Sequence, residues 1–251
     1  MAKQAGIIKL KGTIDDISFY KTADGHLARA KGGVDREKIL HDPAFQRTRE
    51  NGAEFGRAAK GGKLIRGAVR ELVVNAKDRR VVSRLTGLLL SVIKTDVASV
   101  RGSRSIEQGD LSKLLNFDFN INAPHRSTVF LGYNLDFDRV SGEATVDVDA
   151  FSPTVGIAAP SGTTHFKLNF GAGGFDFLIE EAVFADTDTG ILPYTQPEVA
   201  ASGMSVLLKP NMVLPVMLFI GVEFFQEVNG EYYSLKNGAH NSLTVVNVDV
   251  V

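Results

Sequence analysis

The sequence predicts an α+β protein in which an N-terminal β-hairpin arm and a basic helical region precede an antiparallel, immunoglobulin-like β-sandwich. Two patterns and one charge asymmetry lead to this prediction. Apolar residues recur at helical spacing in the first half and alternate with polar residues in the second, and the net charge changes sign between the halves. The predicted segments are the arm at 1–33, the helical region at 34–98, a linker at 99–113 and the acidic sandwich at 114–251.

The arm is predicted from two short apolar stretches and a hairpin turn. Residues 6–11 read GIIKLK and residues 14–21 read IDDISFYK, which favours strands. Asp24 and Gly25 then have the character of a hairpin turn. We expect such an extended arm to add to a neighbour's sheet edge. The apolar arm residues expected to make this contact are Ile7, Ile8, Leu10, Ile17 and Phe19.

Within the helical region, a helix is predicted to begin at Asp42 and Pro43, a favourable N-cap and first-turn pair. Phe45 and Phe55 mark one apolar side of the first helix, and stronger apolar stripes follow within 63–73 and 78–93. We interpret these stripes as core-facing. The basic residues lie largely on the other sides, and those expected in a basic assembly interface are Arg57, Lys60, Lys63, Arg66, Arg70, Arg79, Arg80 and Arg84.

The sandwich is predicted from a period of two beyond the polar, glycine-containing linker. Residues 129–137 and 143–150 alternate apolar with polar side chains, which indicates strands with one buried and one wet face. More strands follow without an intervening helix, separated by turn signals that include residues 171–174 and 229–230. The outward acidic residues expected to form the acidic assembly interface are Asp136, Asp138, Asp147 and Asp149.

The charge asymmetry suggests what kind of partner the chain has. Residues 1–113 hold 23 lysines and arginines against 13 acids, a balance of +10, whereas residues 114–251 hold 5 against 16, a balance of −11. This division points to a polyanionic partner for the basic half or to attraction between oppositely charged halves. Two ordinary solvated surfaces are the simpler alternative.

Composition excludes several classes of function. The chain has no cysteine, so disulfides, thiolate metal sites and cysteine nucleophiles are excluded. No apolar run approaches the length of a membrane span, and the N-terminus lacks the apolar core of a signal peptide. We expect a cytoplasmic protein, with release of an assembled particle as an alternative.

Two short motifs invite a ligand-binding interpretation and do not support one. Gly61-Gly62-Lys63 lacks the leading glycine and the trailing hydroxyl residue of a phosphate-binding loop. The acidic stretch 186–190 begins like a calcium loop, but its fifth ligand position is Gly190 and its twelfth is Pro197.

Catalytic and metal-binding patterns are missing from the sequence as well. The five histidines have no ligand spacing, and there is no G-x-S-x-G nucleophile motif. The sequence thus predicts no catalytic, cofactor-binding or metal-binding residue, no cofactor and no enzyme activity.

The chain resembles an uncharacterised bacterial family, in detail near its N-terminus and in outline in its β-rich second half. The resemblance rests on the opening MAKQAGIIKLKG, the hairpin ISFYKTADGHLARAK, Asp42-Pro43 and the conspicuous residues within 48–56, TRENGAEFG. Its members are similar in their glycine-containing hairpin, basic helical stretch and sandwich-like C-terminal region. This resemblance covers about the first 70 residues in detail. It implies no established activity, so no functional residue is carried over.

Three functional hypotheses follow from these patterns. The first is a structural protein that self-assembles into a filament, tube or ring, through head-to-tail charge complementarity and β-augmentation by the arm. The second places the same assembly in a phage-like or virion structural component. The third is a nucleic-acid-binding protein that uses the basic residues within 47–104.

Overall fold

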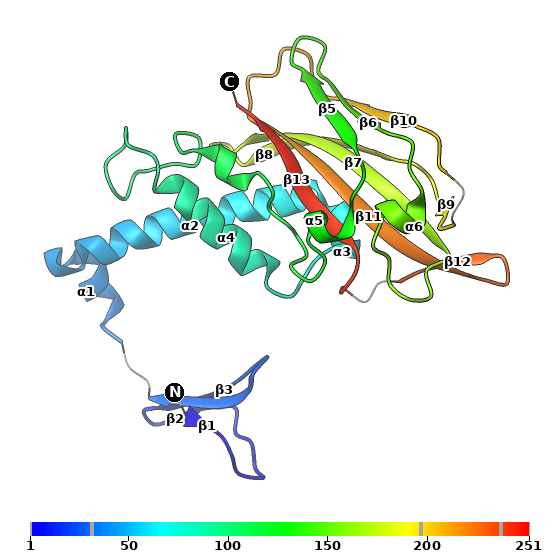
Figure 1. The fold of residues 1–251 in the computed structure, drawn as a ribbon. Helices are drawn as coiled ribbons and strands as arrows, with labels where there is room; N and C mark the ends of the chain where they lie inside the picture. Colours follow the sequence, from blue (N-terminus) through cyan, green and yellow to red (C-terminus); the bar gives the residue numbers. More distant parts are fainter. Residues whose placement is uncertain (1, 31–32, 196–197, 236–237, 251) are drawn as a thin grey trace. The chain divides into compact units, whose positions relative to one another are not determined.

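The computed structural model describes residues 2–30, 33–195, 198–235 and 238–250. The chain forms two compact units, Met1–Glu50 and Asn51–Val251. The α+β class is confirmed, and the sheets are antiparallel (Figure 1). The division between the units lies within the long helix α2 (Gln46–Ala68), and therefore inside the segment 34–98 that was predicted as one region.

The first unit contains a four-stranded sheet in the order β1-β4-β3-β2. Its strands are β1 (Ala2–Lys3), β2 (Gly12–Ile14), β3 (Ile17–Thr22) and β4 (Gly25–Ala30). The predicted hairpin is present, since Thr22 pairs with Gly25 and Gly25 has a φ of 113°, a conformation that favours glycine. Residues 1, 31 and 32 of the predicted arm lie outside the described residues.

Residues 6–11 form a loop between β1 and β2 rather than the predicted strand. The Gln4 side chain explains the loop, because its Oε1 accepts the Leu10 N–H at 2.8 Å and its Nε2 donates to the Leu10 carbonyl at 3.2 Å. One side chain thus satisfies both backbone groups that a neighbouring strand would have paired.

Two short helices lead from the sheet into α2. Helix α1 (Arg36–His41) is capped by Asp35, and the 3₁₀ turn η1 (Pro43–Phe45) is capped by Asp42, whose Oδ1 accepts the Ala44 N–H at 2.9 Å. The predicted helix start is therefore confirmed. Among the described residues of 2–50, none is buried.

The second unit has three layers around one large sheet (Figure 1). One face of this sheet is covered by α2 from Asn51 onward, with α3 (Arg70–Asn75) and α4 (Val81–Ile93). The large sheet comprises β7 (His165–Asp176), β8 (Glu181–Asp188), β9 (Leu192–Pro193), β11 (Val216–Val228), β12 (Glu231–Ser234) and β13 (Ser242–Asp249).

A smaller sheet covers the other face of the large one. It comprises β5 (Tyr133–Asp138), β6 (Glu143–Val148) and β10 (Ser202–Leu207), with β6 in the middle. Short turns connect the layers: η2 (Leu111–Leu114), α5 (His125–Thr128) and α6 (Pro153–Gly156).

Strand β11 shows why the predicted immunoglobulin-like arrangement is not confirmed. Met217 and Phe219 face the helices, whereas Leu218 and Ile220 face the small sheet. The central strands are consequently buried on both faces, not on one. A helical layer occupies the place where a two-sheet sandwich would meet solvent.

Glycines allow close packing at two places that the sequence left ambiguous. Residues 171–174, expected to form a turn, lie inside β7, and a Cβ at Gly171 would lie 2.6 Å from the Phe184 ring. Gly61 and Gly62 are buried in α2, and a Cβ at Gly61 would lie 2.4 Å from Cδ1 of Ile106. The Gly-Gly-Lys sequence therefore reflects close packing of the helix.

Residues 99–113 differ from the predicted linker because they are packed into the core of the second unit. Ile106 and Leu111 are buried together with residues of α2 and α4. Asp96, only 1% exposed, accepts backbone N–H bonds from Ala98, Ser99 and Ser105. This carboxylate fixes the loop, which a polar and glycine-rich composition alone did not reveal.

Candidate functional site

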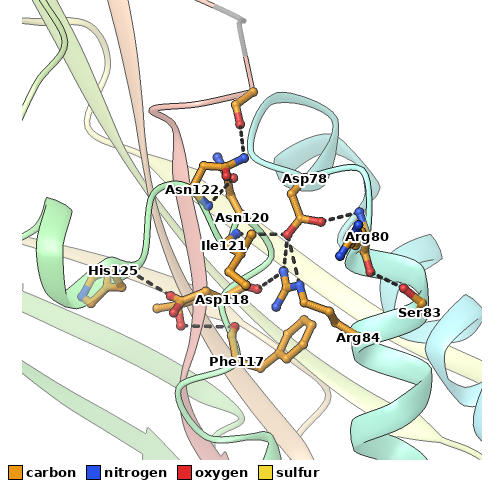
Figure 2. Close-up of polar contacts among 12 residues, drawn as sticks. Asp78, Arg80, Ser83, Arg84, Phe117, Asp118, Asn120, Ile121, Asn122 and His125 are labelled. Carbon is orange, nitrogen blue, oxygen red and sulfur yellow. Dashed lines mark hydrogen bonds and ion pairs between the residues drawn. The ribbon is translucent and has the colours of Figure 1, made fainter. Parts of the chain in front are cut away.

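The candidate site in the second unit is a network of hydrogen bonds around the buried carboxylate of Asp78 (Figure 2). Asp78 precedes α4 and is 9% exposed. Its two oxygens accept hydrogen bonds from the Arg80 N–H, the Arg84 guanidinium and, at 3.0 Å, the Ile121 N–H. Burial raises the pKa of Asp78, but these bonds outweigh burial and hold the pKa below its usual range.

Arg84 extends this contact to the segment that runs beside β13. Its Nη2 donates to the Asp118 carbonyl at 2.7 Å, and its guanidinium lies 5.0 Å from the centre of the Phe117 ring. The Asp118 side chain in turn accepts the His125 N–H at 2.9 Å (Figure 2). Arg84 is therefore a structural cation that fastens α4 to residues 117–125.

A basic pocket of about 470 Å³ lies beside this ion pair. Three exposed side chains on its wall, Lys77, Arg79 and Arg80, make no ion pair or side-chain hydrogen bond within the described part of the chain. Because Asp78 compensates Arg84, the pocket has three uncompensated positive charges. Its remaining lining residues are Ile121, Asn122 and Gly238.

Four of the eight basic residues predicted for the assembly interface are committed to internal contacts or partly buried. Arg57 donates to the carbonyls of Arg104 and Gly102, and Lys60 lies 2.6 Å from a Glu180 carboxylate oxygen. Arg84 is bound to Asp78, and Arg66 is half-buried. The exposed remainder consists of Lys63, Arg70, Arg79 and Arg80.

The four predicted acidic residues lie on the exposed outer side of the small sheet and just beyond it. Asp136 and Asp138 belong to β5, Asp147 belongs to β6, and Asp149 follows β6. In the register of these strands Asp138 is directly opposite Glu143. Like charges at opposed positions repel, so this acidic face has an electrostatic reason to bind cations.

The predicted arm residues are only partly on strands. Ile7, Ile8 and Leu10 lie in the loop between β1 and β2, where Ile7 is 102% and Ile8 is 80% exposed. Ile17 and Phe19 lie on β3; Ile17 is exposed and Phe19 is half-buried. The structure thus presents the two isoleucines at a loop tip rather than along a strand.

A buried polar cluster between α3 and the large sheet was not found from the sequence. Glu223 accepts hydrogen bonds from Asn75 at 2.8 Å and Asn169 at 3.0 Å, and Lys167 lies 3.8 Å from the same carboxylate. Asn241 donates to the Asn75 carbonyl at 3.0 Å. Asn169 in β7 and Glu223 in β11 interrupt apolar runs of the sequence. These interruptions are the sequence signal from which the cluster could have been predicted.

The rejected calcium loop is a strand end. Asp188 accepts the Gly190 N–H at 2.8 Å and pairs with Lys167 at 3.1 Å, while burial and then the charges of Glu71 and Asp188 raise the pKa of Asp186. Pro197 lies outside the described residues. Within the described ranges no group of three acidic or histidine side chains is arranged to hold a metal ion.

Comparison with known proteins gives no relative: no family model, no curated protein and no solved structure matches the chain. The resemblance to a bacterial family therefore stays a prediction. In the parts of the chain that the structure describes, no helix combines the length and apolar character needed to cross a bilayer.

Proposed function

We propose that this protein is a structural subunit that assembles with copies of itself into a filament, tube or ring. The observation that carries the proposal is the first unit, whose described residues form a four-stranded sheet without a single buried side chain. Small sheets need a covered apolar face to be stable. A neighbouring copy is the partner that would cover this sheet in an assembly of identical subunits.

The loop tip offers the apolar part of that contact. Ile7 and Ile8 are almost completely exposed, and Leu10, Ile14 and Ile17 are exposed on the same small unit. Burying the two isoleucines against a neighbour would contribute roughly 3–6 kcal/mol, at about 1.5–3 kcal/mol for each side chain. That is enough to make the arm a main source of assembly free energy.

Unpaired strand edges support β-augmentation as a second contact. Strand β2 is at one edge of the arm's sheet, and β8 is at an edge of the large sheet, where β7 is its paired strand among those described. Both edges present backbone N–H and C=O groups that another strand can pair.

Charge complementarity would orient the subunits. The acidic face on β5 and β6 has Asp136, Asp138 and Asp147 exposed, and Lys63 and Arg70 are exposed on α2 and α3. A head-to-tail contact between these two surfaces is heterologous, so it either closes a ring or propagates as a polymer.

The arm is tested by substituting Ile7→Asp and Ile8→Asp together. We expect the double variant to lose most assembled mass in light scattering, because two carboxylates would have to be buried at the contact. The matched control places aspartates at Val97 and Val213, two exposed valines of the second unit. Equal assembly by the arm variant and the wild-type chain would refute this role.

The charged surfaces are tested by charge reversal. Lys63→Glu with Arg70→Glu should weaken assembly, and adding Asp136→Lys with Asp147→Lys should restore part of it. High salt should also weaken assembly of the wild-type chain, as the two glutamate substitutions do, since exposed charges are screened. A failure of the second pair to restore any assembly would show that these surfaces do not meet.

A further inference from the structure

We propose that the pocket lined by Lys77, Arg79 and Arg80 binds a phosphate group of a small ligand. This inference is independent of the proposed self-assembly. It concerns the basic residues that the internal contacts of the second unit leave uncompensated.

The first step is that the pocket attracts an anion. Three cationic side chains from four consecutive positions gather at one concavity, and the fourth cation, Arg84, is already compensated by Asp78. Like charges held together repel one another unless an anion lies between them, and a concave wall concentrates their field.

The second step concerns which anion fits. Each arginine presents a planar set of N–H donors that matches the oxygens of a phosphate, and the lysine adds a compact positive charge. Asn122 also lines the pocket; its Nδ2 donates one hydrogen to the Gly238 carbonyl at 3.4 Å, and a second N–H remains for a ligand. This set of donors suits a group with several charged oxygens better than a single carboxylate.

The third step concerns the size of the ligand. A pocket of about 470 Å³ falls within the usual range for small-molecule sites. A nucleic acid would need a continuous row of phosphate contacts, but Arg57, Lys60 and Arg84 are committed to internal contacts. These three internal contacts interrupt any such row, whereas Lys77, Arg79 and Arg80 lie together at one pocket.

The fourth step is that the pocket wall is held in place. The Asp78 carboxylate accepts the Arg80 N–H within its own loop and, at 3.0 Å, the Ile121 N–H of a distant segment (Figure 2). These two bonds tie the loop that presents Arg79 and Arg80 to the segment containing Ile121, which lowers the cost of ordering the site on binding.

The test is isothermal titration calorimetry, in which inorganic pyrophosphate is titrated into the full chain at constant ionic strength. We expect saturable binding with one site per chain. Arg79→Ala with Arg80→Ala should weaken it at least about tenfold, as expected for the loss of two charge-assisted contacts. Lys77→Gln, a milder change in the same wall, should weaken it less.

The control removes the same amount of charge elsewhere, by Lys94→Ala with Lys209→Ala, two exposed lysines outside the pocket lining. It should bind pyrophosphate as the wild type does. Absence of saturable binding, or equal loss in the control and the arginine variant, would overturn the proposal. So would a change in assembled mass of the arginine variant with unchanged pyrophosphate affinity.

A second arm identifies the source of the phosphate. A short DNA duplex is added to the pyrophosphate complex at matched phosphate concentration. We expect the duplex to displace little pyrophosphate, because a single pocket contacts few backbone phosphates. Displacement of most of the bound pyrophosphate by the duplex would assign the site to nucleic acid and overturn the small-ligand proposal.

Discussion

Asp138 of β5 lies directly opposite Glu143 of β6, so two carboxylates occupy neighbouring cross-strand positions on the exposed face of the small sheet. Hydrogen bonding from the Ser141 hydroxyl, followed by the Val140 N–H and the Ser141 N–H, lowers the pKa of Asp138. The turn therefore fixes one negative charge beside another. We interpret this acidic face as a surface that binds a positively charged neighbour. The repulsion between the two carboxylates lowers the stability of the unassembled subunit.

This interpretation predicts opposite effects of Glu143→Lys on folding and on assembly. The melting temperature of the unassembled protein should rise by about 1–3 °C, because an opposed repulsive pair becomes attractive. Assembled mass should fall. Glu143→Gln is the neutral control, and both its melting temperature and its assembled mass should lie between those of the wild type and Glu143→Lys. A variant that assembles better than wild type would contradict the assigned role of the acidic face.

Arg84→Met should destabilise the second unit by roughly 3 kcal/mol, since it leaves the Asp78 carboxylate buried without its cation. Urea unfolding measures this change. Adding Asp78→Asn should restore part of the loss, because the neutral amide costs less to bury. Arg79→Ala, an exposed neighbour without such a contact, is expected to stay within about 0.5 kcal/mol of wild type. Similar midpoints for Arg84→Met and Arg79→Ala would show that the ion pair does not hold α4.

The Asp96 loop predicts a defined pH dependence. Burial raises the pKa of Asp96, but hydrogen bonds from Ser99, Ser105 and Ala98 dominate and lower it to about 2 from an ordinary value of 3.8. A lowered native pKa stabilises the fold above the unfolded pKa, and that stability is lost as the pH falls toward the native pKa.

The melting temperature of Asp96→Asn should therefore lie several degrees below wild type at neutral pH. The difference should shrink between about pH 4 and about pH 2, where the wild-type carboxylate takes up its proton. Thermal unfolding of both proteins across this range gives the measurement. A difference that stays constant with pH would mean that ionised Asp96 does not fasten the loop.

Packing of residues 99–113 is tested by a pair of glycine substitutions. A Cβ at Gly109 would lie 2.3 Å from the Val92 carbonyl oxygen, so Gly109→Ala should cost roughly 2 kcal/mol or more. A Cβ at Gly67, in α2, would meet nothing within 4 Å, and Gly67→Ala should stabilise by roughly 0.5–1 kcal/mol. The free energy of unfolding of both variants is measured in urea. Equal, small changes would show that residues 99–113 are not packed into the core and form a linker.

The parts of the fold that the sequence predicts well depend on local patterns. Alternation in 143–150 corresponds to β6, with Ala144, Val146 and Val148 buried, because period-two alternation is a local property of a strand with one covered face. Asp42 is likewise found as a cap, since its hydrogen bond reaches only two residues along the chain.

The parts that were missed depend on which surfaces meet in three dimensions. Phe55 was placed on an apolar side but is 55% exposed, because α2 packs through Ala58, Gly61 and Ile65 instead. The Asp78 site joins positions 43 residues apart through the Ile121 N–H. Such a backbone donor has no sequence signature.

The most direct test of the central claim is the mass of the purified full chain in solution, measured by light scattering with parallel negative-stain electron microscopy. Self-assembly predicts regular particles whose mass is many times the 27.1 kDa of one chain, and whose mass falls as salt is added. A species of one-chain mass at high protein concentration, unaffected by salt, would contradict the account.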